Sequence, residues 1–306
     1  MKYLFFDIES PDGNVGAICE FGYVICDEHF KVLDQNVFVM NPERKFNTIN
    51  RKRRPDVHFY YPKHIYLNSP TFPNYYERIK KLLTQPDVMV FGYSVSNDIR
   101  YIAYTCKRYL LPSFDYVAFD VQTMHKNVKK LDHIVGLDTA INDIPVNEKQ
   151  GLFMHRSDCD AKMTMLVLKY LLANHHLTLN ELLNNGSLYR LSALTYIKQL
   201  EENRKNKQER AKIQKLWFDF VNNSVIDERK TCTLSSQILK SDVKTLADII
   251  KNIKQTNLRP VRGARNAQYL IVKDKNDELR LRAVFTIPIT FEFITLEELV
   301  NFKKKN

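Results

Sequence analysis

An apolar run near the beginning of the sequence, residues 3–8, limits the possible folds more than any other segment. Only Asp7 interrupts this run, and Glu9 follows it. Such a run predicts a strand that is buried on both faces, as in the sheet of an α/β protein. Residues two positions apart on a strand point to the same face, so we expect Asp7 and Glu9 to lie side by side. The run therefore predicts a buried strand that ends in two neighbouring carboxylates.

The segments that follow alternate between strand and helix patterns. Residues 17–26 and 37–40 are rich in strand formers and, with the first strand, predict an antiparallel meander. Residues 41–75 combine a run of cations with prolines and aromatics, which predicts a loop-rich insertion. Further strands are expected at 88–93 and 117–121, and helices at 75–83, 97–111 and 158–173. The pattern predicts an α/β fold with a mixed sheet of about five strands and helices on both faces.

The rest of the chain predicts a helical connector and a second, small α/β domain. Thr178 and Glu181 have the spacing of a capping box, Ser187 is expected to open another helix, and residues 201–215 are polar enough to extend into solvent. Beyond them we expect a helix at 242–253, strands at 268–272 and 291–294, and a helix capped by Thr295 at 295–302. The predicted domains are therefore residues 1–174, 175–228 and 229–306.

The charge is distributed unevenly along the chain. Its net value is +11, from 46 Lys and Arg against 35 Asp and Glu. Residues 1–173 hold 22 cations against 20 acids, and residues 174–306 hold 24 against 15, so most of the excess lies in the second half. A basic half predicts a polyanionic partner, with nucleic acid first, and a solvated lysine-rich surface explains the same charge equally well.

Cysteine content and hydropathy limit the expected location of the protein. There are five cysteines, and no pair has CxxC spacing, which argues against a disulfide framework or a cysteine-rich zinc site. The apolar runs are far shorter than the roughly 20 residues that span a bilayer. The opening residues carry acids where an export signal is still apolar. We expect a cytoplasmic protein with no membrane partner.

Acidic residues recur beside the predicted buried elements. Asp98 follows the strand 88–93 at the opening of a helix, and His155 and Asp160 flank another helix start. Carboxylates are costly to bury together unless a cation lies between them. Carboxylate oxygens are ligands that Mg²⁺ and Mn²⁺ prefer. Taken singly, each acid is more often a helix cap or a solvent-facing strand end.

Together these residues resemble the motifs of a nuclease family. Three segments carry the resemblance: Phe6 to Glu9, Gly92 to Asp98, and His155 to Ala161. In order and spacing they are similar to the three motifs of the DEDDh 3′–5′ exonucleases, the family of bacterial polymerase proofreading subunits and ribonuclease T. The stretch Ile18 to Val24, which contains Glu20 and Gly22, is similar to the second-strand pattern of this family. The resemblance covers about residues 1–173 and implies a ribonuclease H-like fold.

The resemblance also implies catalytic roles. His155 would take the proton from the attacking water as a general base. Four acids would bind two Mg²⁺ or Mn²⁺ ions, which clamp the attacking and leaving oxygens of a phosphodiester. Asp158 competes with Asp160 for the third-motif position, and the family spacing selects Asp160 and leaves Asp158 as a helix cap. The four acids are Asp7, Glu9, Asp98 and Asp160.

Nucleic-acid contacts are expected from two regions. In the insertion, Arg51, Arg53 and Arg54 precede a group of aromatics, and such a combination can hold a phosphate backbone and stack bases. A basic loop without a ligand explains the insertion equally well. The positions that the resemblance implies for substrate contact hold Ser10, Tyr93 and Arg156. The second motif departs from the family pattern at Tyr93, Ser94 and Asn97, which affects these contacts more than metal binding.

The C-terminal segment resembles a degenerate BRCT domain. Its expected order of strand, helix, strand, strand and helix carries the resemblance, together with the stretch Ile287 to Leu299. Thr256 and Asn257 stand where that family has two glycines, and the usual tryptophan of the last helix is absent. Such a domain implies a protein partner, for example a polymerase.

Two functions are consistent with the sequence. The first is a metal-dependent 3′–5′ exonuclease that acts on single-stranded DNA or RNA 3′ ends, with DNA slightly favoured. The second is a catalytically weak module with an exonuclease fold that binds nucleic acid or a polymerase. All the catalytic positions of the three motifs are filled, which favours the enzyme.

Overall fold

The chain forms two compact units, Met1–Gln199 and Leu200–Asn306. The computed structural model describes residues 1–11, 16–44, 59–184, 188–285 and 290–302. None of the described helices is both long enough and apolar enough to cross a membrane. The predicted division of the chain at residues 174 and 228 stays a prediction.

The first unit is built on a mixed sheet of six strands. The strands are β1 (Lys2–Glu9), β2 (Glu20–Asp27), β3 (Val32–Val39), β4 (Val88–Gly92), β5 (Val117–Asp120) and β6 (Arg190–Ser192). Their order is β3-β2-β1-β4-β5-β6. Strands β1, β2 and β3 form the predicted antiparallel meander, β4 and β5 continue parallel to β1, and β6 is antiparallel to β5.

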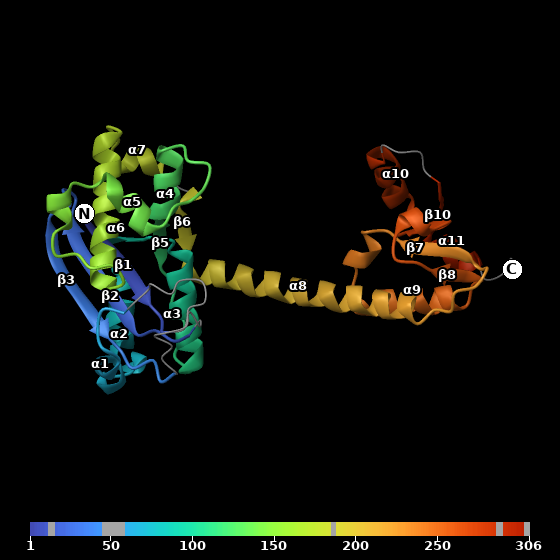
Figure 1. Cartoon of the computed structure of the whole chain (residues 1–306), viewed down its shortest axis with the longest axis horizontal. Helices are drawn as coiled ribbons and strands as arrows, with labels where there is room; N and C mark the ends of the chain where they lie inside the picture. The colour runs from blue at the N-terminus through green and yellow to red at the C-terminus, as the bar shows by residue number, and fades with distance from the viewer. Residues whose placement is uncertain (12–15, 45–58, 185–187, 286–289, 303–306) are drawn as a thin grey trace. The chain divides into compact units, whose positions relative to one another are not determined.

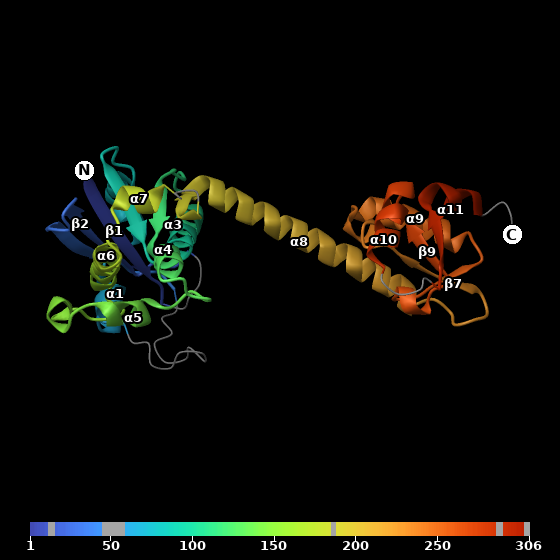
Figure 2. The same ribbon diagram turned by 90° about the horizontal axis from the view of Figure 1, so that it is seen from above.

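Helices cover both faces of this sheet (Figures 1 and 2). They are α1 (Lys63–Asn68), α2 (Phe72–Leu83), α3 (Ser96–Arg108), α4 (Val121–Val128), α5 (Leu137–Ala140), α6 (Ser157–Asn174) and α7 (Leu179–Leu183). Successive residues of β1 serve the two faces: Phe5 packs in the core that contains α6, and Phe6 in the core that contains α2 and α3. Both side chains are fully buried. The predicted mixed α/β architecture, with β1 buried on both faces, is confirmed.

The structure differs from the sequence-based expectation at the end of this unit. The helix predicted to open at Ser187 begins at Ala193, as α8 (Ala193–Asn222), because residues 190–192 first pair with β5 as a sixth strand. Three residues are too few to show the alternation that predicts a strand. The capping box at Thr178 and Glu181 is confirmed, and both of its hydrogen bonds are present at the start of α7.

The second unit has a parallel sheet of four strands with the order β10-β9-β7-β8. Its elements are β7 (Lys230–Leu234), α9 (Val243–Lys254), β8 (Leu258–Pro260), β9 (Tyr269–Val272), α10 (Lys275–Val284), β10 (Glu292–Thr295) and α11 (Leu296–Phe302). Ile213 and Trp217 from α8 are buried in its core. Thr295 Oγ1 accepts a hydrogen bond from the Glu298 nitrogen, which confirms the predicted cap of the last helix.

Gly22 lets the start of α6 lie directly against strand β2. A Cβ atom at this position would lie 2.0 Å from the Asp158 nitrogen and 2.1 Å from the Ser157 carbonyl carbon, closer than real side chains approach. Gly22 is also the cross-strand neighbour of Asp7. This backbone contact therefore sets how closely the start of α6 approaches the end of β1.

We expect Gly22→Ala to destabilise the protein by about 3 kcal/mol, the upper range for overpacking of a filled interior. The cost is high because the atoms in the way belong to the backbone and cannot rotate aside. Thermal unfolding measures the effect. Gly263→Ala is the matched control, since a Cβ there meets no atom within 4 Å. Equal melting temperatures for the two variants would contradict the close contact.

Candidate active site

Three elements of the first unit bring the predicted catalytic residues together. Asp7 and Glu9 lie at the end of β1, Asp98 lies in the first turn of α3, and His155 and Asp160 lie at the start of α6. Because β1 and β4 are parallel neighbours, α3, which follows β4, begins at the sheet edge where β1 ends. A cavity of about 210 Å³ at this edge is lined by Asp7, Glu9, Tyr93, Gly136, Leu137, Asp138, Met154, His155 and Asp160.

His155 contacts both acids beside it. Its Nδ1 lies 3.2 Å from Glu9 Oε1, and its backbone nitrogen donates a hydrogen bond of 2.9 Å to Asp160 Oδ2. One potential ligand atom from each of these three residues lies within 4.8 Å of the others. The His155 backbone has a φ of 62°, in the left-handed region that residues with a Cβ seldom adopt. Backbone strain of this kind concentrates at functional sites.

Burial and mutual repulsion raise the pKa values of three acids in this group. Burial is the largest cause for Asp98 and Asp160, which are 4% and 5% exposed, and the charge of Asp7 raises both pKa values further. The pKa of Asp7 is raised first by burial and then by Glu9, although part of the Asp7 surface still reaches solvent. The acids therefore repel one another in a pocket that the protein shields from water.

The pocket fits a divalent cation. Asp160 Oδ1 is buried and has no hydrogen-bond partner among the described residues. None of the described residues that line the cavity is Lys or Arg. Buried carboxylates without a cationic partner suit a hard ion such as Mg²⁺ or Mn²⁺. The carboxylates that fit this role are those of Asp7, Glu9, Asp98 and Asp160.

Some residues line the cavity although no sequence pattern predicts them. Leu137 and Asp138 belong to the short helix α5, and Met154 lies just before His155. Residues 129–154 have no regular hydrophobic period and hold none of the motifs that carry the resemblance. Only the folded chain places these side chains opposite the end of β1. Asp138 adds one more acid to the cavity lining.

The residues that are predicted to contact nucleic acid lie in different surroundings. Tyr93 lines the cavity, and its hydroxyl donates a hydrogen bond of 2.9 Å to the Val135 carbonyl. Ser10 is buried, with 3% of its surface exposed. Arg156 lies with its guanidinium carbon 4.9 Å from the centre of the Tyr60 ring. Three arginines of the insertion are also predicted to contact nucleic acid, namely Arg51, Arg53 and Arg54. They lie outside the described residues.

The prediction that Asp158 caps a helix is wrong. Arg156 is the N-cap residue of α6, and Asp158 lies inside the first turn. Asp158 Oδ1 accepts a hydrogen bond of 2.7 Å from Arg156 Nε, and Asp158 Oδ2 accepts one of 2.8 Å from Gln35 Nε2. These partners hold Asp158 away from the cavity lining, where Asp160 is found. Of these two acids, Asp160 lines the cavity and Asp158 does not.

Glu20 joins strand β2 to α1 and to the start of α6. Its carboxylate is fully buried and accepts two hydrogen bonds of 3.1 Å from the nitrogen and hydroxyl of Ser157, and another from the Tyr66 hydroxyl. Glu20 is also the cross-strand neighbour of Glu9. Burial, the largest cause, raises the pKa of Glu20 from 4.5 to about 7. Sequence reasoning finds Glu20 only as part of a strand pattern.

We expect the metal-free protein to lose stability as the pH rises, with Glu20 contributing part of the loss. The pKa of Glu20 is about 7 in the folded protein and near 4.5 when it is unfolded. The folded state therefore binds this proton more tightly, and the stabilisation that is complete below pH 4.5 is lost as the pH rises through 7. This difference corresponds to about 3 kcal/mol.

Thermal unfolding in EDTA at several pH values between 4.5 and 8 tests this expectation. Glu20→Gln keeps an oxygen that can accept from Ser157 but cannot ionise, so its stability should fall less with pH than that of the parent protein. Glu77→Gln is the control, because the Glu77 side chain is 78% exposed. A parent-like pH profile for Glu20→Gln would show that Glu20 does not titrate in this range.

No profile of a known protein family matches this chain, and no curated protein matches it in sequence. Solved nuclease structures are similar to it in fold. A structure of exonuclease X with 5′-overhanging duplex DNA is 12% identical, with a TM-score of 0.43, and the match covers 59% of this chain and 96% of that one. E. coli exonuclease I with a dA16 oligonucleotide is 14% identical, with a TM-score of 0.43 and coverage of 60% and 42%.

A third similar structure is that of cell-death related nuclease 4. It is 16% identical to this chain, with a TM-score of 0.44, and the match covers 56% of this chain and 64% of that one. This chain thus spans nearly all of exonuclease X and less than half of exonuclease I. At these identities the likeness concerns the fold, so the roles of individual residues rest on the geometry of the site.

Proposed function

We propose that this protein is a metal-dependent 3′–5′ exonuclease that hydrolyses phosphodiester bonds at single-stranded 3′ ends, with DNA slightly favoured over RNA. The observation that carries the proposal is the cluster of Glu9, His155 and Asp160, whose ligand atoms lie within 4.8 Å of one another. Asp7 lines the same cavity, and burial and then the charge of Asp7 raise the pKa of Asp98. Several carboxylates beside one histidine suit two-metal hydrolysis of a phosphodiester.

The residues of the cavity would have two different roles in the reaction, metal binding and proton transfer. The four acids Asp7, Glu9, Asp98 and Asp160 would hold two Mg²⁺ or Mn²⁺ ions, which supply charge stabilisation and an acidified water when bound. Because His155 Nδ1 faces Glu9, a proton on Nδ1 is stabilised there and Nε2 is left as the basic nitrogen. Nε2 would then accept the proton of the attacking water.

The remaining contacts are proposed from position and charge. Ser10, Tyr93 and Arg156 would contact the substrate strand near the cavity, and Arg51, Arg53 and Arg54 would contact its phosphates. The second unit is proposed to be BRCT-like, with a possible protein partner. Its parallel sheet and its order of strand, helix, strand and strand support that proposal. A cytoplasmic location stays part of the proposal.

The test is degradation of 5′-labelled single-stranded DNA and RNA of equal sequence in Mg²⁺, Mn²⁺ or EDTA. We expect products that shorten step by step from the 3′ end, only with a divalent ion. A circular single strand should resist, because it has no end. Cleavage of the circle, or hydrolysis that continues in EDTA, would contradict the proposal. Binding of the labelled strand without cleavage would favour a nucleic-acid-binding module instead.

A further inference from the structure

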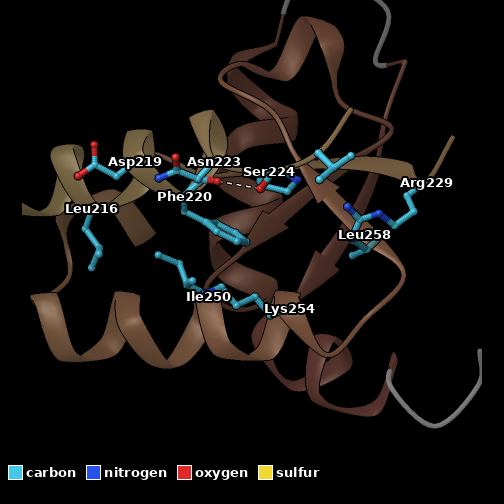
Figure 3. Close-up of a pocket in the computed structure, with 11 residues that line it drawn as sticks. Leu216, Asp219, Phe220, Asn223, Ser224, Arg229, Ile250, Lys254 and Leu258 are labelled. Carbon is cyan, nitrogen blue, oxygen red and sulfur yellow. Dashed lines mark hydrogen bonds between the residues drawn. The ribbon is translucent and has the colours of Figure 1, made fainter. Parts of the chain in front are cut away.

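A cavity of about 460 Å³ lies within the second unit, where the end of α8, the loop after it, α9 and β8 meet. We call it the C-terminal cavity, and it is lined by Leu216, Asp219, Phe220, Asn223, Ser224, Val225, Arg229, Ile250, Lys254, Leu258 and Pro260. Figure 3 shows the Phe220 ring between α8 and α9, with Ile250 and Lys254 beside it. The volume is in the range of small-ligand sites, and the lining is mainly apolar with a few charged groups.

Three charged residues line the C-terminal cavity, namely the cations Arg229 and Lys254 and the acid Asp219. From residue 249 to residue 273 the chain has six Lys and Arg and no Asp or Glu. Lys254 from this stretch lies with its Nζ 5.6 Å from the centre of the Phe220 ring. Arg229 also lines the cavity and pairs with Asp227 at 2.7 Å. The carboxylate of Asp219 points away from α9 in Figure 3, so it does not lie between Lys254 and the Phe220 ring.

An exposed aromatic ring, Phe218, lies elsewhere on α8 and does not line the C-terminal cavity; we call it the Phe218 platform. Phe218 is 44% exposed, and the Arg262 guanidinium carbon lies 5.6 Å from the centre of its ring. Arg262 also donates a hydrogen bond of 2.8 Å to Asn222 Oδ1 one turn further along α8. An exposed ring with an arginine beside it and an apolar cavity with cations at its rim are the elements that hold single strands.

We propose that the C-terminal cavity and the Phe218 platform bind nucleotides of a single-stranded nucleic acid, as a second contact apart from the catalytic pocket. The apolar lining receives a base, and Lys254 and Arg229 receive its phosphates. This inference rests on the proposed function for the class of ligand. It goes beyond that function because it places strand binding on named residues of the second unit, whose basic charge the catalytic pocket does not use.

The first test compares two lysines of the same helix in the full-length protein. Affinity for a labelled 20-mer of thymidylate is measured against salt concentration in EDTA, which suppresses cleavage. Lys254→Gln should lower affinity about fivefold at 0.1 M salt and reduce the salt slope by about 0.7, the value of one phosphate contact on a single strand. Lys244→Gln is the control, since Lys244 is exposed on α9 but does not line the cavity. Equal effects of the two substitutions would overturn the proposal.

The second test separates stacking from charge. Phe218→Ala should lower affinity for the same 20-mer by about fivefold or more, the lower limit for losing one stacked base, while the salt slope stays unchanged. Phe285→Ala is the control, because that ring is 39% exposed in the same unit and lies outside the platform. Unchanged affinity of Phe218→Ala would overturn the proposal. So would equally tight binding of polyglutamate, because that polyanion has no bases.

A small substrate distinguishes failure of this inference from failure of the proposed function. Thymidine 5′-(p-nitrophenyl phosphate) holds one nucleotide and has no strand to reach a second contact. Lys254→Gln and Phe218→Ala should hydrolyse it at the parent rate while binding the 20-mer more weakly. If the two variants bind the 20-mer more weakly than the parent protein but the parent hydrolyses neither substrate, the proposed function fails and this inference stands. If hydrolysis occurs and the variants bind normally, this inference alone fails.

Discussion

Asp7→Ala and Asp160→Ala should each lower the rate of hydrolysis of single-stranded DNA by at least about 10²-fold, a loss of about 2.7 kcal/mol of transition-state stabilisation. Both side chains line the cavity at the end of β1, and one oxygen of Asp160 has no partner among the described residues. Each substitution removes a proposed ligand of a metal ion that would stabilise the negative charge of the transition state. Asp132→Ala, which changes an exposed acid of the same unit, is the control and should retain the parent rate.

A second, independent prediction concerns the stability of Asp7→Ala and Asp160→Ala. Burial and repulsion disfavour the ionised carboxylates, so removing one should leave the melting temperature in EDTA unchanged or raise it. Added Mn²⁺ should raise the melting temperature of the parent protein much more than that of either variant. Near-parent activity together with a full response to Mn²⁺ would remove Asp7 and Asp160 from the metal site.

His155→Ala should lower kcat by about 10² to 10⁴, the usual contribution of a general base. The physical reason is the contact of Nδ1 with Glu9, which leaves Nε2 free to act on a water. Alanine also has a Cβ, so the left-handed backbone at this position is strained in both proteins. The effect on kcat therefore reports the imidazole rather than a change of the loop. His133→Ala, at an exposed histidine, is the control.

Calorimetric titration with Mn²⁺ decides between two roles for His155. The imidazole is close enough to Glu9 and Asp160 to be a metal ligand as well as a base. A general base leaves metal affinity nearly unchanged when it is removed, whereas a ligand does not. Loss of Mn²⁺ binding in His155→Ala would reassign the residue as a ligand, and an unchanged kcat would exclude both roles.

The elements with a strong hydrophobic period are those that sequence reasoning predicts best. Strand β1 and helix α6 each bury a long apolar pattern, and they carry three of the five proposed catalytic residues. Helix α9 is predicted within one residue at each end, because its apolar spacing is regular and Asp242 caps it. Strand β6 is missed because its three residues are held by pairing with β5 rather than by their own pattern.

The parts of the site that sequence reasoning misses depend on contacts between distant segments. Asp138 reaches the cavity from a segment without a motif, and Glu20 gains its role from Tyr66 and Ser157, which lie 46 and 137 residues away along the chain. The error at Asp158 has partly the same origin, since Gln35, 123 residues away, binds one of its oxygens, while Arg156, two residues away, binds the other. No local pattern contains the distant partners.

The contact at Gly22 has a consequence for redesign of this protein. Backbone atoms of Ser157 and Asp158 lie directly over Gly22, so backbone atoms rather than cavity-lining side chains limit how closely α6 approaches β2. Substitutions at Leu137, Asp138 or Met154 can therefore change the shape and charge of the cavity while the proposed metal ligands keep their spacing. Substrate preference should evolve in those positions with little penalty, provided that Gly22 is left untouched.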